Sequence, residues 1–101
     1  MNRESVVRQI GVGFLLSSAH ADAVTGTVHG HTYEVVAWFA AGPDAVKLRA
    51  GCERLCADLD HTVLPAELAW AEAIAEEVKR RTNALEVEIR RPLERLYARV
   101  A

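Results

Sequence analysis

Alternation of hydrophobic and polar residues dominates the first forty positions of the chain. In residues 6–20 one parity carries nearly all the large apolar side chains, and the other carries mostly small or polar ones. This period of two predicts a β-strand with one buried face. The alternation returns in residues 29–41, and residues 21–28 between the two segments are typical of a turn. The pattern therefore predicts an antiparallel hairpin of two long strands.

The middle of the chain changes to helical spacing. Gly42-Pro43-Asp44 ends the second strand, and Asp44 is placed to cap a helix whose apolar residues recur up to Leu59. A second helix is expected to begin at or near Pro65 and to end near Asn83, with acidic residues early and basic residues late, which suits the helix dipole. Its apolar stripe consists of Trp70, Ala71, Ile74, Ala75 and Val78.

The end of the chain alternates again. Residues 85–90 and 96–100 are typical of strands, and a turn is expected around Pro92. The predicted order is therefore ββααββ within one domain spanning residues 1–101. We expect an α+β fold in which a four-stranded antiparallel sheet carries two helices on one face.

Composition excludes several classes of protein. The 101 residues include 12 Lys and Arg against 14 Asp and Glu, giving a formal net charge of -2. Such a chain has no basic field for a nucleic-acid backbone. It also lacks the roughly 18 consecutive apolar residues that a membrane span needs. The first residues do not resemble a secretory leader, so we expect a cytoplasmic protein. A chain this short buries a modest fraction of its surface, which favours association.

Two cysteines lie four residues apart in the first predicted helix. A disulfide between Cys52 and Cys56 would be strained at that spacing, so reduced thiols are expected. Both are interpreted as small buried hydrophobic residues and not as nucleophiles.

Histidines supply the most informative pattern. In His29-Gly30-His31 the two imidazoles project from the same face of a strand. His20 ends the preceding strand with the parity of its buried face, and the hairpin would bring it beside this pair. Three neutral imidazoles without a fourth protein ligand are typical of a catalytic zinc site with an open position. The alternative is a pair of surface or hydrogen-bonded histidines with no metal.

Two polar groups leave alternatives open. The carboxylate of Asp60 could orient the ring of His61 for general acid or base chemistry, or the two residues could form a polar turn between helices. Arg90-Arg91 beside Glu88 could bind an anion, or they could be exposed charges that flank a turn.

Three segments together resemble a known family. They are Phe14-Leu15-Leu16-Ser17-Ser18-Ala19-His20, His29-Gly30-His31-Thr32-Tyr33 and Leu59-Asp60-His61. In this order they resemble the 6-pyruvoyltetrahydropterin synthase family, which includes the 6-carboxytetrahydropterin synthases of queuosine synthesis. The likeness covers nearly the whole chain, and all four histidines match motif positions. The chain would be a short, divergent member.

The resemblance implies the tunnelling fold. In that fold a subunit with four strands and two helices trimerises into a barrel, and two trimers stack into a homohexamer with sites at subunit interfaces. It also implies zinc held by the residues that match His20, His29 and His31. The implied substrate is a dihydropterin such as 7,8-dihydroneopterin triphosphate, and the implied activity is that of a lyase.

Further matches imply roles for individual residues. Asp60 and His61 match the family's Asp-His pair, which helps proton transfer and is catalytic. Glu72 matches a substrate-binding glutamate on the second helix.

Departures from the family pattern concern the reaction and the pterin anchor. Thr25 stands where the family has its catalytic cysteine, and the hairpin loop around it is shorter. The glutamate that grips the pterin aligns with Ile89. Glu88 is next to it and is the candidate replacement for substrate binding, although it should point to the opposite face of the strand.

The residues leave three functions open. The first is a zinc-dependent lyase in which His61, supported by Asp60, replaces the cysteine. The second is a catalytically impaired homologue that binds a pterin-like ligand or serves as a structural oligomer. The third is a related reaction, driven by zinc-bound hydroxide, on a substrate that makes the cysteine unnecessary.

Overall fold

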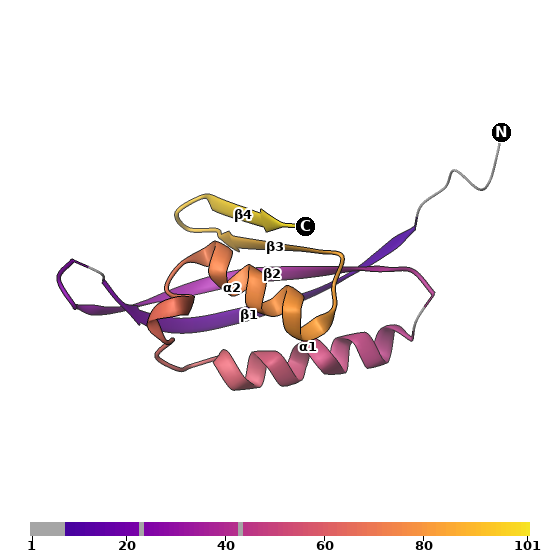
Figure 1. The fold of residues 1–101 in the computed structure, drawn as a ribbon, viewed down its shortest axis with the longest axis horizontal. Coiled ribbons are helices and arrows are strands. Elements are labelled where there is room, and N and C mark those ends of the chain that lie inside the picture. Colours follow the sequence, from indigo (N-terminus) through magenta and orange to yellow (C-terminus); the bar gives the residue numbers. More distant parts are fainter. Residues whose placement is uncertain (1–7, 23, 43) are drawn as a thin grey trace.

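A computed structural model describes residues 8–22, 24–42 and 44–101. Within these ranges the elements follow the predicted order ββααββ (Figure 1). They are β1 (Gln9–Ala21), β2 (Val28–Ala40), α1 (Ala45–Leu59), the 3-10 helix η2 (Ala66–Leu68), α2 (Ala71–Thr82), β3 (Glu86–Arg91) and β4 (Leu96–Val100). The first residues of the first predicted strand, and Pro43, lie outside the described residues. None of the helices in the described ranges is long and apolar enough to cross a membrane.

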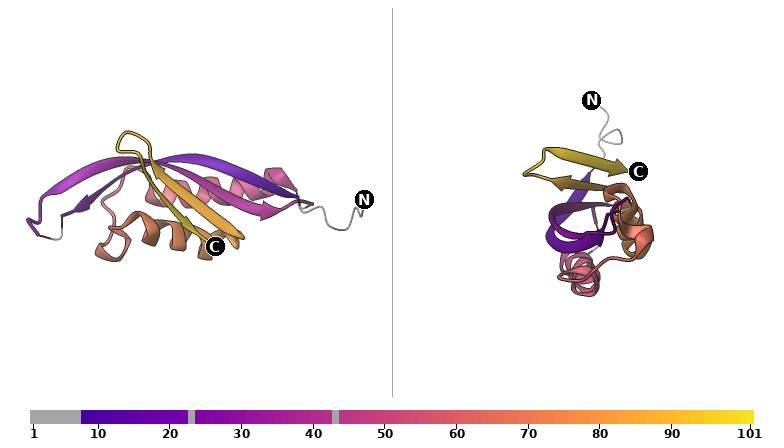
Figure 2. Two further views of the ribbon diagram at one scale, coloured as in Figure 1. Left: turned by 90° about the horizontal axis from the view of Figure 1, so that it is seen from above. Right: turned by 90° about the vertical axis from the view of Figure 1, so that its left-hand side faces the viewer.

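The sheet is antiparallel throughout, in the spatial order β1-β2-β3-β4. β1 and β2 form a hairpin of 13 residues on each side, paired from Gln9 opposite Ala40 to Ala21 opposite Val28. Both helices lie on the same side of the sheet (Figure 2). The predicted fold class is therefore confirmed.

The core lies between this sheet face and the two helices. Its sheet residues have the parities that the alternation predicts, because every second side chain of a strand points to the same face. Fully buried sheet residues are Leu16, Tyr33, Val35, Ala37, Val87 and Ile89. The helices add Cys52, Leu55, Ile74, Ala75 and Val78. Leu64 and Leu68, from the connection between the helices, are also buried, and the helical spacing did not single them out.

Predicted helix caps are confirmed at two positions. The side chain of Asp44 accepts a hydrogen bond from the backbone N–H of Val46 at 2.9 Å, at the start of α1. Asn83 ends α2 in the left-handed conformation, with φ 60°, and its N–H donates to the carbonyl of Lys79 at 2.9 Å.

The start of the second helix differs from the prediction. Pro65 leads into the short helix η2, and α2 begins only at Ala71. Trp70 is extended, with φ −103° and ψ 142°, and its side chain is 63% exposed. Its predicted place in the buried stripe is therefore wrong. The physical reason is that η2 turns Leu68 into the core, which leaves Trp70 on the bend between two helical segments.

The connection after α1 runs along the outer edge of β1. The N–H of Ala19 donates to the carbonyl of Thr62 at 2.9 Å, and the N–H of Leu64 donates to the carbonyl of Ala19 at 2.7 Å. Ala19 and Val63 form a parallel bridge. These bonds fix the end of α1 against the strand that carries His20.

Both cysteines are free, as expected. Cys52 is buried, and Cys56 is half-buried with its thiol donating to the carbonyl of Leu15 at 3.2 Å. Burial raises the pKa of each thiol. Raised pKa values lower the fraction of reactive thiolate, which agrees with a packing role.

Candidate metal centre

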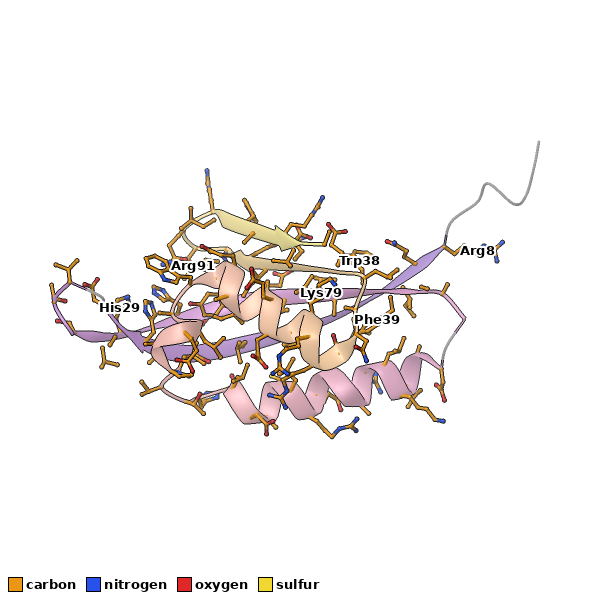
Figure 3. The ribbon with its side chains drawn as sticks, in the orientation of Figure 1. Arg8, His29, Trp38, Phe39, Lys79 and Arg91 are labelled. Carbon is orange, nitrogen blue, oxygen red and sulfur yellow. The ribbon has the colours of Figure 1, made fainter. Side chains whose placement is uncertain are left out.

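Three histidines meet near the tip of the β1–β2 hairpin. His20 and His29 are direct partners in the strand register, and His31 lies opposite Ser18. Because His29 and His31 are two residues apart, they share the helix side of the sheet with His20. Figure 3 shows His29 at the end of the hairpin where the two strands extend beyond the helices.

The imidazole rings are close enough to share one ligand. Ring centroids lie 4.4 Å apart for His20 and His29, 5.0 Å for His20 and His31, and 4.9 Å for His29 and His31. One ring nitrogen from each residue lies within 4.8 Å of the other two. Nε2 of His20 and Nε2 of His31 are 3.0 Å apart.

The donor set fits zinc. Zinc–nitrogen bonds of about 2.0–2.1 Å place two nitrogen ligands of a tetrahedral site roughly 3.3 Å apart. The 3.0 Å separation therefore needs only a small adjustment. Nδ1 of His20 is buried without a hydrogen-bond partner among the described residues. The 3.0 Å contact also suits a hydrogen bond between the two rings, which is the metal-free alternative.

The surroundings of His31 favour its neutral form. Burial lowers the pKa of His31, and the nearby guanidinium of Arg91 lowers it further. A neutral imidazole is the form that binds metal ions.

A cavity of about 390 Å³ adjoins the three histidines. Its walls include Tyr33, Trp70, Arg91 and Tyr97, and Glu72 from the first turn of α2 also lines it. The volume lies within the range of small-molecule sites. The structure therefore brings Glu72 to the pocket of the histidines.

Glu88 lies elsewhere. It projects from the opposite face of β3 to Ile89, as its parity predicts, and it does not line the histidine pocket. Its carboxylate pairs with Arg90 at 2.8 Å and lies 3.8 Å from Arg99. The hydrogen bond from Arg90 lowers the pKa of Glu88. Within one chain, this carboxylate is thus engaged on the open face of the sheet.

Asp60 and His61 form a hydrogen-bonded pair. Oδ2 of Asp60 lies 2.7 Å from Nδ1 of His61, and Oδ1 accepts the backbone N–H of Ser17 at 2.7 Å. The bond from Ser17 is the main cause that lowers the pKa of Asp60, and the bond to His61 adds to it. Asp60 therefore contacts the imidazole and also joins the end of α1 to β1.

The pair is separate from the histidine cluster within one chain. The His61 side chain is 80% exposed and lines a second cavity of about 490 Å³ with Ser17, Gly30 and Glu94. The two cavities have His31 in common. Among the described residues, no hydrogen bond joins His61 to the three clustered histidines.

Two positions depart from the family pattern in the structure as well. Thr25 lies in the hairpin turn, where its hydroxyl accepts the N–H of Thr27 at 3.2 Å. The turn is closed by the N–H of Asp22, which donates to the carbonyl of Thr27 at 2.8 Å. Ile89 is fully buried in the core. Neither side chain lines the histidine pocket.

The two adjacent arginines have different environments. Arg90 lies on the open face and donates to Glu34 at 3.1 Å and to Glu88 at 2.8 Å. Arg91 lines the histidine pocket and donates through Nη2 to Glu94 at 3.1 Å. The sequence left Arg91 open as an anion-binding residue or an exposed charge beside a turn, and the structure places it beside the histidines. The sequence signal for this side of the sheet is its parity, which it shares with the core residue Ile89.

Comparisons with known proteins agree with the fold. No family model matches the sequence, and no curated protein matches it. Among solved structures, the chain is similar to 6-pyruvoyl tetrahydropterin synthase from Caenorhabditis elegans, with a TM-score of 0.65 and 16% sequence identity. The alignment covers 94% of this chain and 95% of that one. At this identity the likeness establishes a shared fold.

Proposed function

We propose that this chain is a zinc-dependent lyase acting on a dihydropterin such as 7,8-dihydroneopterin triphosphate. His20, His29 and His31 hold the zinc ion. The observation that carries the proposal is the convergence of three imidazoles from paired strands on one pocket. The fold shared with a 6-pyruvoyl tetrahydropterin synthase supports a pterin-like ligand.

The chain's own residues suit this chemistry. Zinc supplies a Lewis acid, and three protein ligands leave a position open for an oxygen of the substrate. Trp70 is 63% exposed and offers a flat wall to a planar ring. The carboxylate of Glu72 is available to accept hydrogen bonds from ring N–H groups.

Proton transfer is assigned to His61, oriented by Asp60. Because this pair lies apart from the histidine cluster of its own chain, it acts in the pocket of a neighbouring copy. The proposal therefore includes an oligomer, a homohexamer built as a dimer of trimers, with sites at subunit interfaces. We place the protein in the cytoplasm, where reduced cysteines such as Cys52 and Cys56 persist.

A second candidate function is that of a catalytically impaired homologue, which binds a pterin-like ligand or serves as a structural oligomer. Two observations favour it. Thr25 replaces the expected cysteine nucleophile and lies in a hydrogen-bonded turn. Ile89, at the expected position of the pterin-anchoring glutamate, is buried in the core.

Zinc content tests the metal site first. Protein purified without chelator is expected to contain about one zinc per chain. His29→Ala and His31→Ala should each lose it. His61→Ala is the matched control, because it removes the fourth histidine without touching the cluster, and it should keep its zinc. Full zinc retention in His29→Ala or His31→Ala would contradict the site.

Turnover separates the two candidate functions. Zinc-loaded protein is incubated with 7,8-dihydroneopterin triphosphate, and release of triphosphate is followed by chromatography. If the chain is a lyase, the wild type releases triphosphate. His61→Ala should then reduce this release without changing the zinc content. Pterin binding without release would support the impaired homologue instead.

A further inference from the structure

Arg91 lies at the point where β3 leaves the core and reaches the histidine pocket. It is the last residue of β3 and shares the helix side of the sheet with Val87 and Ile89. Those two side chains are fully buried among apolar neighbours, whereas Arg91 lines the cavity with the histidines. Figure 3 shows Arg91 toward the same end of the molecule as His29.

The hydrogen bonds of the Arg91 guanidinium are incomplete. Nη2 donates to Glu94 Oε1 at 3.1 Å. Nε is buried and has no partner in the described part of the chain. Buried donors in folded proteins nearly always have an acceptor. The Nε–H group of Arg91 has none among the described residues. A ligand in the adjoining cavity does not reach this buried atom. The donor left for a ligand is Nη1, which has no hydrogen bond among the described residues.

With zinc bound, the charges around the pocket would favour an anion. Zinc held by three neutral imidazoles keeps its full charge, and the guanidinium adds another positive charge. The facing carboxylates are Glu72 and Glu94, and Glu94 is already engaged by Arg91 while lying 3.6 Å from Nδ1 of His31. Positive charge therefore exceeds negative charge once the metal is bound.

The shape of the Arg91 guanidinium further restricts the chemical class of the ligand. A guanidinium presents parallel N–H donors that match the paired oxygens of a carboxylate or phosphate. The exposed ring of Trp70 lines the same cavity. This combination suits a planar ring that bears an acidic substituent.

We propose that Arg91 is a specificity-determining residue that binds an oxyanion of the ligand in the histidine pocket. The oxyanion is a carboxylate or a phosphate on the substituent of the ring. The inference rests on the proposed function, in which the pocket takes a pterin-like ligand. It adds that Arg91 is the residue that binds the negatively charged substituent of such a ligand, so that a pterin with a neutral substituent binds more weakly.

A purely structural role for Arg91 makes a different prediction. Its bond to Glu94 lies within the turn that joins β3 to β4, so loss of Arg91 could loosen the pocket beside this turn. A loosened pocket would bind charged and neutral ligands more weakly by the same factor. The ratio of the affinities for charged and neutral ligands therefore distinguishes binding of the oxyanion by Arg91 from a purely structural role.

The test compares pterin-6-carboxylate with 6-hydroxymethylpterin, which share a ring and differ in charge. Binding is titrated on the wild type, Arg91→Gln, Arg91→Lys and the control Arg95→Gln, which removes an exposed arginine of the same turn. The wild type and Arg95→Gln should prefer the carboxylate roughly tenfold to hundredfold. In Arg91→Gln the two affinities should become about equal, and Arg91→Lys should be intermediate.

Inorganic phosphate distinguishes the two sources of the oxyanion. If phosphate displaces pterin-6-carboxylate from the wild type and not from Arg91→Gln, the site accepts phosphate groups. If it displaces the ligand from neither protein, while the preference still depends on Arg91, the oxyanion is a carboxylate. Both results support the proposal.

Three results would overturn it. They are equal affinities in the wild type, an unchanged preference in Arg91→Gln, and no binding of any oxyanion at millimolar concentration. Zinc content is measured on the same preparations, and titrations are repeated without metal. A protein that lacks zinc and still shows the Arg91-dependent preference would refute the zinc site alone. If Arg91→Gln does not fold, the Arg91→Lys ratio decides the question.

Discussion

His20 and His29 lie directly opposite each other in the β1–β2 register, with ring centroids 4.4 Å apart. Their approach is set by backbone pairing, so the fold itself brings two of the three candidate ligands together. A slip of one residue in this register would move one ring to the other face of the sheet. The geometry of the candidate metal centre therefore depends on the hairpin.

Two glycines of the hairpin should respond differently to an added methyl group. A Cβ at Gly11 would lie 2.9 Å from the indole ring of Trp38, its register partner, whereas a Cβ at Gly30 would lie 3.7 Å from its nearest neighbour, the carbonyl of Ser18. Gly11→Ala should cost about 1–3 kcal/mol of unfolding free energy. Gly30→Ala should change it by less than about 1 kcal/mol and keep zinc.

Urea denaturation and zinc analysis of both variants check this prediction. A large loss of stability in Gly30→Ala, or none in Gly11→Ala, would contradict the spacing described for the hairpin.

Adjacent leucines of β1 test the burial of its two faces. Leu16 is fully buried and Leu15 is 64% exposed. Leu16→Ala should lower the unfolding free energy by about 2–5 kcal/mol, because it leaves a cavity in the core. Leu15→Ala should cost less than about 1 kcal/mol. Chemical denaturation measures both changes, and equal losses would show that the open face of β1 is covered in the assembled protein.

Asp60 should make stability depend on pH in the acid range. The N–H of Ser17 and the ring of His61 hold the pKa of Asp60 below its ordinary value. A carboxyl with a lowered folded-state pKa stabilises the fold above its unfolded pKa of about 4, and that contribution is lost as pH falls through the folded value. Asp60→Asn should therefore be less stable than the wild type at pH 7, with the difference shrinking below about pH 4.

Denaturation curves of both proteins between neutral pH and pH 3 measure that difference. A difference that stays constant over the whole range would show that the charge of Asp60 contributes nothing.

The assembly should be visible in solution. The exposed apolar residues Leu93, Leu96 and Tyr97 lie on or next to β4, at one edge of the sheet. We expect them to be covered by another copy, because apolar surface favours association. Light scattering should give the mass of six chains, and a monomer at micromolar concentration would refute the proposed hexamer.

The strands and the face of the histidines could be predicted because both depend on a period of two. Alternation assigns each strand residue to one face, and parity alone places His20, His29 and His31 on the same side of the sheet. The sequence did not show that Asp60 bonds both His61 and the backbone of Ser17, since that contact joins residues 43 positions apart.

One misjudged side chain, Trp70, and one that the sequence left open, Arg91, have environments set by tertiary structure. Trp70 has helical spacing to Ile74, and local spacing does not reveal that a 3-10 turn precedes the helix. Arg91 next to a turn was as consistent with a solvated charge as with an anion site. Its environment comes from β1 and β2, whose histidines form the cavity that it lines.

The segment that follows α1 limits how a second copy could join the sheet. Its residues already bond the outward-facing backbone groups of Ser17 and Ala19, and the carbonyl of Leu15 accepts the thiol of Cys56. A strand from another subunit therefore has only the part of the β1 edge before Leu15 to extend. This stop would fix the alignment of neighbouring subunits along the strand, and with it the distance from one subunit's His61 to the next subunit's histidine pocket.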